Sequence, residues 1–342
     1  MVQPSAQPAV LQAHASADTG VPQATAALDS EVVPPWGEQP ERRVQRVGAA
    51  LHSQRLDKAL VAMAGEFSRS HLQSLIERGL VSVDGVPSRS ASRKVSAGQE
   101  IEVELAPTDE SRAFRPEAMA LAIVFEDAHL LVVDKPAGLV VHPAAGNWSG
   151  TLLNGLLAHH AAAATLPRAG IVHRLDKDTS GLMVVAKSLP SMTGLTRAIA
   201  ARDVSRIYLA LAHGDVKGKH FSIDAPIGRD PQVRVRMAVV ALGKPARTDV
   251  EVLACAHRAS ALRCTLHTGR THQIRVHLAS RGHPLVADAV YGGAAAFGLA
   301  RQALHATRLA FSHPVTGQTM AFDAALPPDL AGAWAEVTHG KR

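Results

Sequence analysis

The side chains best suited to chemistry lie close together within the stretch GIVHRLDKDTSGLMVVAK, residues 170–187. This segment brings an imidazole at His173, a guanidinium at Arg174 and carboxylates at Asp176 and Asp178 into a few positions. A carboxylate can act as a nucleophile or exchange protons, and a neighbouring cation favours its ionised form. Apolar residues flank the polar centre on both sides, so we expect a loop that packed elements hold in a fixed geometry.

The same residues admit plainer interpretations. Asp-Lys-Asp-Thr-Ser-Gly is also typical of an ordinary turn, in which Asp and Ser side chains bind backbone N–H groups. A calcium loop is excluded, because its fifth position is Ser180 and its twelfth, where a bidentate glutamate is required, is Lys187. Zinc binding lacks support, since Cys255 and Cys264 form no C-x-x-C pair and no H-E-x-x-H motif occurs. We therefore expect no metal site.

Three further segments bear on the choice between these interpretations. They read LVVDKPAGLVVHPAAG (131–146), ARDVSRIYLALAHG (201–214) and LHTGRTHQIRVHLASRGHPLVADAVYGG (266–293). Together with HRLDKDTSG they resemble, in the same order, the motifs of the RluA/RluD family of RNA pseudouridine synthases. One nine-residue match can arise by chance, whereas chance rarely produces four matching segments in the family's order. The resemblance covers most of residues 121–326.

The resemblance implies an isomerase that breaks the N-glycosidic bond of a uridine in RNA, rotates the uracil and rejoins it through carbon, without a cofactor. It assigns the reactive carboxylate to Asp176, either as a nucleophile or as an aid to glycosidic cleavage. It places Arg270 beside Asp176 as the cation that keeps the carboxylate charged. Tyr208 would stack on the flipped uracil and take the proton from its C5, and Ile274 would form an apolar wall.

The resemblance also implies that Arg174 fills the space that the flipped base leaves in the RNA. His173, beside Arg174, is a further candidate for contact with the RNA. An arginine near an aspartate is more often a structural ion pair, and His173 is equally compatible with a hydrogen-bonded structural residue. The chain departs from the family where Gly-Asp-Pro is usual, because it reads Ala287-Asp288-Ala289. Alanine replaces both the glycine and the proline, two residues with special backbone preferences, so the local turn can differ. We expect the chemistry to survive.

Composition bounds the class of protein. The chain has 342 residues, which predicts two folded units and a tail. Lys and Arg exceed Asp and Glu by six, although residues 1–41 hold five acidic residues and no Lys or Arg, so the remainder is distinctly basic. A basic folded part indicates a polyanionic partner. Few cysteines, no apolar run of membrane-spanning length and no signal peptide predict a cytoplasmic protein without a membrane partner.

We expect four parts along the chain: a disordered tail (1–45), a small α+β S4 domain (46–107), a linker (108–116) and the catalytic domain (117–340). The tail is rich in Ala, Pro, Gln and Ser and cannot bury enough surface to offset its ordering entropy. RLDKAL and SRSHLQSLIERGLVSVDGV, which begin at Arg55 and Ser68, resemble an S4 RNA-binding domain. By that resemblance Arg55 and Arg69 would contact RNA phosphates.

Local patterns place the motifs on elements. Leu130 to Val133 reads as a buried strand, and Ile207, Leu209 and Leu211 as a strand with Tyr208 on its other face. Ser68, Thr151 and Thr271 are each expected to cap a helix. The fold class that the resemblance implies is α+β, with a mixed, mainly antiparallel central sheet flanked by helices and loops.

These observations favour site-specific isomerisation of uridine in 23S ribosomal RNA, within precursor particles of the large subunit, by a monomeric enzyme. A pseudouridine synthase for another ribosomal site or for transfer RNA is the first alternative. A non-catalytic RNA-binding assembly factor is the second, and it is disfavoured because Asp176, Tyr208 and Arg270 are all present. A serine hydrolase using Ser180 lacks the G-x-S-x-G motif.

Overall fold

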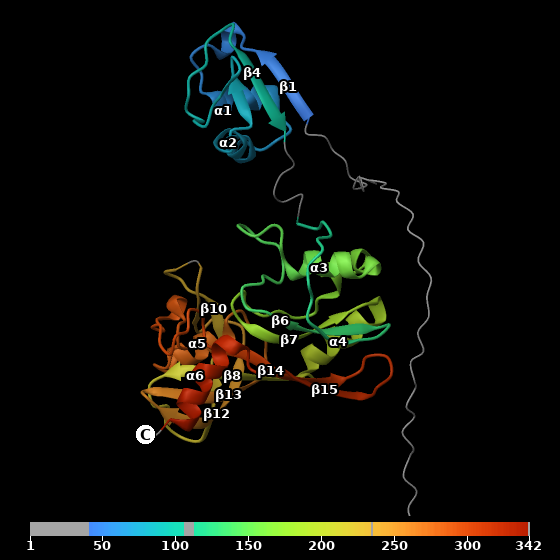
Figure 1. The fold of residues 1–342 in the computed structure, drawn as a ribbon, viewed down its shortest axis with the longest axis vertical. Helices are drawn as coiled ribbons and strands as arrows, with labels where there is room; N and C mark the ends of the chain where they lie inside the picture. The colour runs from blue at the N-terminus through green and yellow to red at the C-terminus, as the bar shows by residue number, and fades with distance from the viewer. Residues whose placement is uncertain (1–40, 106–112, 234, 341–342) are drawn as a thin grey trace, which may run out of the picture. The chain divides into compact units, whose positions relative to one another are not determined.

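The computed structural model describes residues 41–105, 113–233 and 235–340, which belong to two compact units, residues 1–106 and 107–342 (Figure 1). Residues 1–40 of the expected tail and residues 106–112, which include part of the expected linker, lie outside the described residues. The tail boundary at residue 45 is wrong, because strand β1 (Glu41–Arg46) pairs with β4 (Glu100–Leu105). Most side chains of β1 are charged and exposed, so its sequence lacks the apolar alternation that predicts a strand.

The first unit packs two helices on a four-stranded antiparallel sheet of order β1-β4-β2-β3. Its remaining elements are η1 (Ala49–Leu51), α1 (Leu56–Met63), α2 (Arg69–Glu77), β2 (Val81–Val83) and β3 (Val86–Pro87). The Ser68 hydroxyl accepts a hydrogen bond from the His71 backbone N–H at 3.3 Å, which confirms Ser68 as the cap of α2. Leu60 and Leu75, from the two helices, share one core with Val103 of the sheet.

The second unit is built on a nine-stranded sheet of order β5-β6-β7-β14-β8-β13-β12-β9, with β15 paired to β14. Within the described residues its pairs are antiparallel except β7 with β14, which confirms the expected mixed, mainly antiparallel sheet. The strands are β5 (Ile123–Glu126), β6 (Leu130–Lys135), β7 (Ser180–Ala186), β8 (Ser205–His213), β9 (His220–Asp224), β12 (Arg247–Ala256), β13 (Ala259–Leu266), β14 (Leu304–Ser312) and β15 (Thr319–Asp323). A separate two-stranded ribbon joins β10 (Ile227–Arg229) and β11 (Met237–Val239).

Helices cover the sheet of the second unit. They are α3 (Leu152–His159), α4 (Leu189–Ala201), α5 (Gln273–Ser280) and α6 (Pro328–His339), with the 3-10 turns η3 (Ala161–Thr165), η4 (Pro167–Gly170) and η5 (Ala289–Tyr291). Thr151 caps α3 in a reciprocal capping box with Asn154, as its sequence position predicts. No helix in the described ranges is long and apolar enough to span a lipid bilayer.

Strand β6 is apolar at successive positions because both of its faces are covered. Leu131 and Val133 pack in the core that includes α3, whereas Leu130 and Val132 pack in the core that includes α4 (Figure 1). A strand buried on both sides reads as a continuous apolar run, which is the pattern that predicted it. β7 has the same character, and its first residue follows directly on the polar loop that contains Asp176.

Strand β8 and helix α5 bring two of the other motifs to that loop. In β8 the buried face carries Tyr208, while Ile207 and Leu209 lie half-buried on the other face, as predicted. Helix α5 does not begin with a Thr271 cap, so that expectation is wrong: its cap position is His272, with φ +56° and no side-chain cap bond. The Gln273 side chain instead accepts hydrogen bonds from the Arg270 N–H and the Thr268 hydroxyl, at 3.0 and 2.7 Å, and so folds the loop back on the helix.

Gly181 is a position where this fold leaves no room for a side chain. It lies in β7 opposite Ala306 of β14, with φ +115°, and a Cβ there would overlap the Ala306 backbone. We expect Gly181→Ala to lower the free energy of unfolding by about 3 kcal/mol, from steric overlap and backbone strain together. Gly150→Ala is the control, because Gly150 also has a positive φ, +65°, but open space around it. Urea unfolding of the full chain measures both, and equal effects would show that overlap with β14 is unimportant.

Candidate active site

The loop that carries Asp176 is held by its backbone. The Lys135 ammonium donates to the Lys177 carbonyl at 3.0 Å, and the Gly138 N–H donates to the same oxygen at 2.9 Å. On the other side, the Arg301 guanidinium donates to the Asp178 carbonyl at 3.0 Å. The carbonyls after Asp176 are thus tied to two cationic side chains, which fixes the position of the carboxylate between them.

Lys135 is the more unusual of these two anchors, because its side chain is almost fully buried, with 1% exposed. Its ammonium also donates to the carbonyls of Pro136 and Leu139, at 2.7 and 2.9 Å, so three backbone oxygens surround one charge. Burial lowers the pKa of Lys135 to about 8, while the nearby carboxylates of Asp178 and Asp176 oppose that shift. A buried ammonium of this kind draws separate loops together.

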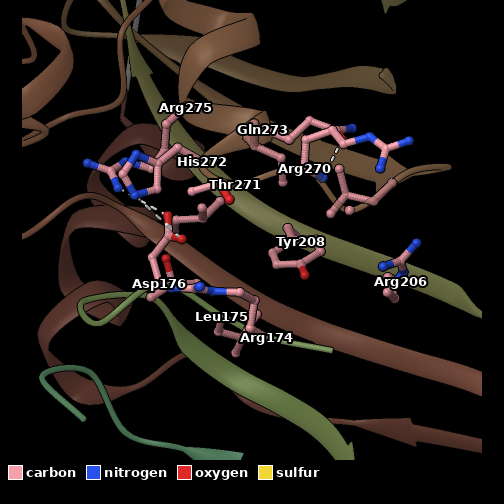
Figure 2. Close-up of a pocket in the computed structure, with 15 residues that line it drawn as sticks. Arg174, Leu175, Asp176, Arg206, Tyr208, Arg270, Thr271, His272, Gln273 and Arg275 are labelled. Carbon is pink, nitrogen blue, oxygen red and sulfur yellow. Dashed lines mark hydrogen bonds and ion pairs between the residues drawn. The ribbon is translucent and has the colours of Figure 1, made fainter. Parts of the chain in front are cut away.

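The Asp176 carboxylate is bound by an arginine from helix α5. Arg275 Nη1 lies 3.1 Å from Asp176 Oδ2, and the opposite edge of the guanidinium makes a bidentate pair with Asp288 at 2.7 and 2.8 Å. Arg275 and Asp288 are buried, whereas Asp176 remains 15% exposed. His272 Nε2 approaches the other Asp176 oxygen to 3.9 Å (Figure 2). The Asp288 carboxylate is therefore closed off from solvent, whereas the Asp176 carboxylate is open to a ligand.

Arg270 is not the cation beside Asp176, so that expectation is wrong. Its guanidinium donates to the Pro245 carbonyl at 3.0 Å, and Figure 2 shows it beyond Tyr208 as seen from Asp176. The physical reason lies in the start of α5: Arg270 belongs to the loop that Gln273 folds back, whereas Arg275 lies on the first turns of the helix and faces the carboxylates. Arg270 still contributes to the wall of the pocket.

A pocket opens beside Asp176, between the loop, β8 and α5. Tyr208, Ile274, Arg174, Arg206 and Thr271 are among the residues that line it (Figure 2). Burial raises the pKa of the Tyr208 phenol to about 12, an effect that Arg206 opposes and Asp176 reinforces. The phenol is therefore protonated near neutral pH. A protonated phenol can stack on a base. To accept a proton from C5 of uracil, however, the phenol must first lose its own proton.

The other predicted residues of this unit lie at the edges of the pocket. Arg174 is exposed at its rim, and Ile274 is buried in its wall, 3% exposed. His173 turns away from Asp176 and accepts a hydrogen bond from the Val184 N–H at 3.0 Å. Burial lowers the pKa of His173 to about 3, with a smaller contribution from Arg206, so its imidazole is neutral. This geometry agrees with the structural interpretation of His173.

Arg55 and Arg69 belong to the first unit, where both bind one buried carboxylate. Asp57 accepts hydrogen bonds from Arg55 at 3.1 Å, from Arg69 at 2.8 Å and from Gln73 at 2.7 Å. The Arg55 and Arg69 guanidiniums are about half exposed, whereas Asp57 is fully buried. Hydrogen bonding from Arg55, with help from Arg69, holds the pKa of Asp57 well below its usual range. The two guanidiniums are consequently fixed at the surface in one arrangement.

Sequence reasoning missed Lys135, Arg275, Asp288 and Asp57. Lys135 and Arg275 lie inside the quoted motifs, but several cations there have equivalent spacing, and only the folded chain distinguishes them. Asp288 lies in the Ala-Asp-Ala sequence that departs from the family. Ala287 has φ +58°, the left-handed conformation that glycine adopts more easily, so the backbone turn persists without the glycine. Only the folded chain distinguishes Asp288, because its signal is burial beside Arg275.

The fold and this carboxylate-guanidinium pocket define an RNA-modifying enzyme of the pseudouridine synthase class. Residues 129–280 match the family described as RNA pseudouridylate synthase, and residues 54–101 match the S4 domain. The chain is 52% identical over 291 residues to ribosomal large subunit pseudouridine synthase D of Neisseria meningitidis serogroup B, covering 81% of this chain and 76% of that protein. The protein of the same name from Nitrosomonas europaea is 50% identical over 285 residues, with 81% and 82% covered.

A solved structure gives the same assignment. Human RNA pseudouridylate synthase domain containing 1 superposes with a TM-score of 0.50 at 27% identity, over 67% of this chain and 90% of that one. The chain belongs to the RNA pseudouridylate synthase family, and it is an RNA pseudouridine synthase with an S4 domain.

Arg275 and Arg270, both in the segment 266–293, make separable predictions. Arg275→Gln removes the counter-charge of two carboxylates, so we expect the single-turnover rate of uridine isomerisation to fall by about a hundredfold. Arg270→Gln loses one contact to a carbonyl and should lower that rate by less than about fivefold. Thermal unfolding of both variants controls for misfolding. A large loss of rate in Arg270→Gln with little in Arg275→Gln would restore Arg270 as the partner of Asp176.

Lys135 predicts a specific pH dependence of stability. Its folded-state pKa, about 8, lies below the ordinary value of 10.5, so between these pH values the unfolded chain binds a proton that the folded chain does not. Stability that depends on Lys135 should therefore rise with pH across this window, by up to about 1.4 kcal/mol per pH unit. Urea unfolding of wild type and Lys135→Met at pH 7.5, 8.5 and 9.5 measures the difference. Exposed Lys177, replaced by Met, is the control, and a pH-independent difference for Lys135→Met would contradict the prediction.

Proposed function

We propose that this enzyme isomerises uridine to pseudouridine in 23S ribosomal RNA and that Asp176 supplies the reactive carboxylate. The observation that carries the substrate is the identity of about half of the aligned residues to enzymes named for the large ribosomal subunit, over an alignment that includes most of both chains. Precursor particles of that subunit, in the cytoplasm, are the proposed setting, and a monomeric state stays a prediction.

The pocket supports the role of Asp176. Its carboxylate is partly exposed, receives one hydrogen bond from Arg275 and faces a cavity that Tyr208 and Ile274 also line. The Arg275 guanidinium lies 3.1 Å from the carboxylate that we assign to either nucleophilic attack or assistance to glycosidic cleavage. Asp288 holds Arg275 from behind, so we assign it a positioning role. Arg275 takes the place in this proposal that the family resemblance assigned to Arg270.

The remaining roles follow from the walls of the pocket. The face of Tyr208 is proposed to stack on the flipped uracil, with Ile274 as the apolar wall. Flipping the base costs a few kcal/mol, and the exposed Arg174 at the rim is placed to occupy the vacated stack. In the first unit, Arg55 and Arg69 present fixed guanidiniums to RNA phosphates.

Asp176→Asn tests the proposed chemistry. The substitution keeps the size of the side chain but removes its charge, so we expect isomerisation to fall by roughly a thousandfold or more. RNA affinity should stay within about twofold, since the phosphate contacts are unchanged. Tritium release from 23S transcripts that contain 5-tritiated uridine measures the reaction, and filter binding measures affinity. Exposed Asp203, replaced by Asn, is the matched control and should keep full activity.

The substrate is tested separately by mapping pseudouridine in RNA from cells that lack this protein. Loss of modification at sites in 23S RNA is the expected result. Loss in transfer RNA or elsewhere in ribosomal RNA would move the assignment to the alternative substrates. Wild-type protein that releases no tritium from ribosomal or transfer RNA would contradict the proposed activity on either.

A further inference from the structure

A second cavity adjoins the Asp176 pocket and is lined by cations without a carboxylate. It has a volume of about 390 Å³ and shares Arg174, Arg206, Gly269 and Arg270 with the first pocket as a common wall. Its charged or titratable lining residues are Arg168, Arg174, Arg202, Arg206, Arg270, His142, His173 and His267. A concave surface with five arginines and no acidic residue fits an anionic ligand.

Arg206 is the residue that most needs such a ligand. It lies in β8 two positions before Tyr208, on the same buried face and about 7 Å along the strand. Its side chain is buried, with 5% of the residue exposed, yet its Nε has no hydrogen-bond partner among the described residues. Arg275 is equally buried but binds two carboxylates. A buried guanidinium without a counter-charge is costly, so its retention here calls for an anion.

A second buried polar atom on the same cavity is also unpaired. Within the described ranges, three buried side-chain nitrogens lack a hydrogen-bond partner, and two of them, Arg206 Nε and His142 Nε2, line this cavity. Burial lowers the pKa of His142 to about 4, with further contributions from Arg174 and Arg168, so its imidazole is neutral and can donate through one nitrogen. The cavity thus offers a charged donor and a neutral donor to one ligand.

The chemistry of the lining favours a phosphate over a base. No Phe, Tyr or Trp belongs to this cavity, so the large aromatic faces on which bases usually stack are missing from its lining. A guanidinium instead matches the oxygens of a phosphate with its fixed fork of donors. Because the two cavities share a wall, an RNA strand that inserts a uridine into the first carries its neighbouring phosphodiesters past the second.

We propose that this cavity is a subsite for a phosphodiester group next to the target uridine, with Arg206 as its buried ligand. The proposal depends on the proposed function, in which the uridine occupies the Asp176 pocket. Arg206 is then a positioning residue: by holding the backbone beyond Tyr208 it fixes the ribose relative to Asp176 (Figure 2). His142 and the exposed Arg202 complete the subsite.

Gly269 offers a way to disturb the subsite without removing charge. A Cβ at Gly269 would lie 2.9 Å from Arg206 Nη1, the far end of a flexible side chain, and Gly269 has no positive φ. Gly269→Ala should therefore fold and displace the guanidinium.

The test uses short RNAs that contain the uridine mapped as this enzyme's target, in ribosomal or transfer RNA, so an error in the 23S assignment leaves it intact. Each RNA carries one neutral methylphosphonate, either at a phosphate flanking the uridine or four nucleotides away. For wild type we expect a flanking substitution to raise KM about tenfold, with kcat changed less than threefold, and the distant one to have little effect.

Arg206→Gln should raise KM for unmodified RNA by a similar factor and then be insensitive to the flanking methylphosphonate. Exposed Arg263, replaced by Gln, should keep the full sensitivity of wild type. Should Arg206→Gln unfold, as thermal denaturation would reveal, Gly269→Ala takes its place with the same expectation. The proposal is overturned if no flanking phosphate matters to wild type, or if the Arg206 and Gly269 variants retain the wild-type sensitivity.

Discussion

The arrangement of the active site depends on one buried guanidinium. Arg275 is held on one edge by Asp288, through two hydrogen bonds of 2.7 and 2.8 Å, and this leaves Nη1 to meet Asp176 at 3.1 Å. Burying an arginine between carboxylates is stabilising only when the geometry satisfies its donors, and here both carboxylates do so. The interaction joins the loop before β7 to two segments that follow much later in the chain, helix α5 and the turn that contains Asp288. Displacement of any one of them would change the charge environment of the open carboxylate.

The sheet explains why these segments meet. β14 lies between β7 and β8, so the loop that enters β7 and the Tyr208 face of β8 are held at a fixed separation by a strand that pairs with both. Gly181 permits the close β7–β14 approach, and Lys135 and Arg301 bind the backbone carbonyls of Lys177 and Asp178, respectively. The Asp176 carboxylate is thus positioned mainly through backbone contacts, which leaves its own oxygens free for the guanidinium and for a ligand.

Local patterns predicted the elements of this enzyme better than the partners of its side chains. The continuous apolar run at Leu130 to Val133 has few structural solutions, and hydroxyls at Ser68 and Thr151 precede helices that need caps. Thr271 had the same appearance, but Gln273 supplies the hydrogen bonds of that loop. Choosing Arg275 over Arg270 required knowing where α5 begins, and the positive φ at His272 shifts that start. The sequence did not predict β1, because an exposed, charged edge strand has little apolar periodicity.

The distribution of positive charge around the pocket separates two tasks. Arg275 is paired with the carboxylates of Asp176 and Asp288, whereas Arg206, on the far side of Tyr208, has no such partner in the described chain. In the proposed complex, a polyanionic RNA would bring its own charge close to the Asp176 carboxylate, and repulsion between the two would oppose binding. Cations committed to the carboxylates shield that anion, and cations left uncommitted beyond the base attract the backbone. This division allows one small pocket to hold a negatively charged group beside a negatively charged strand.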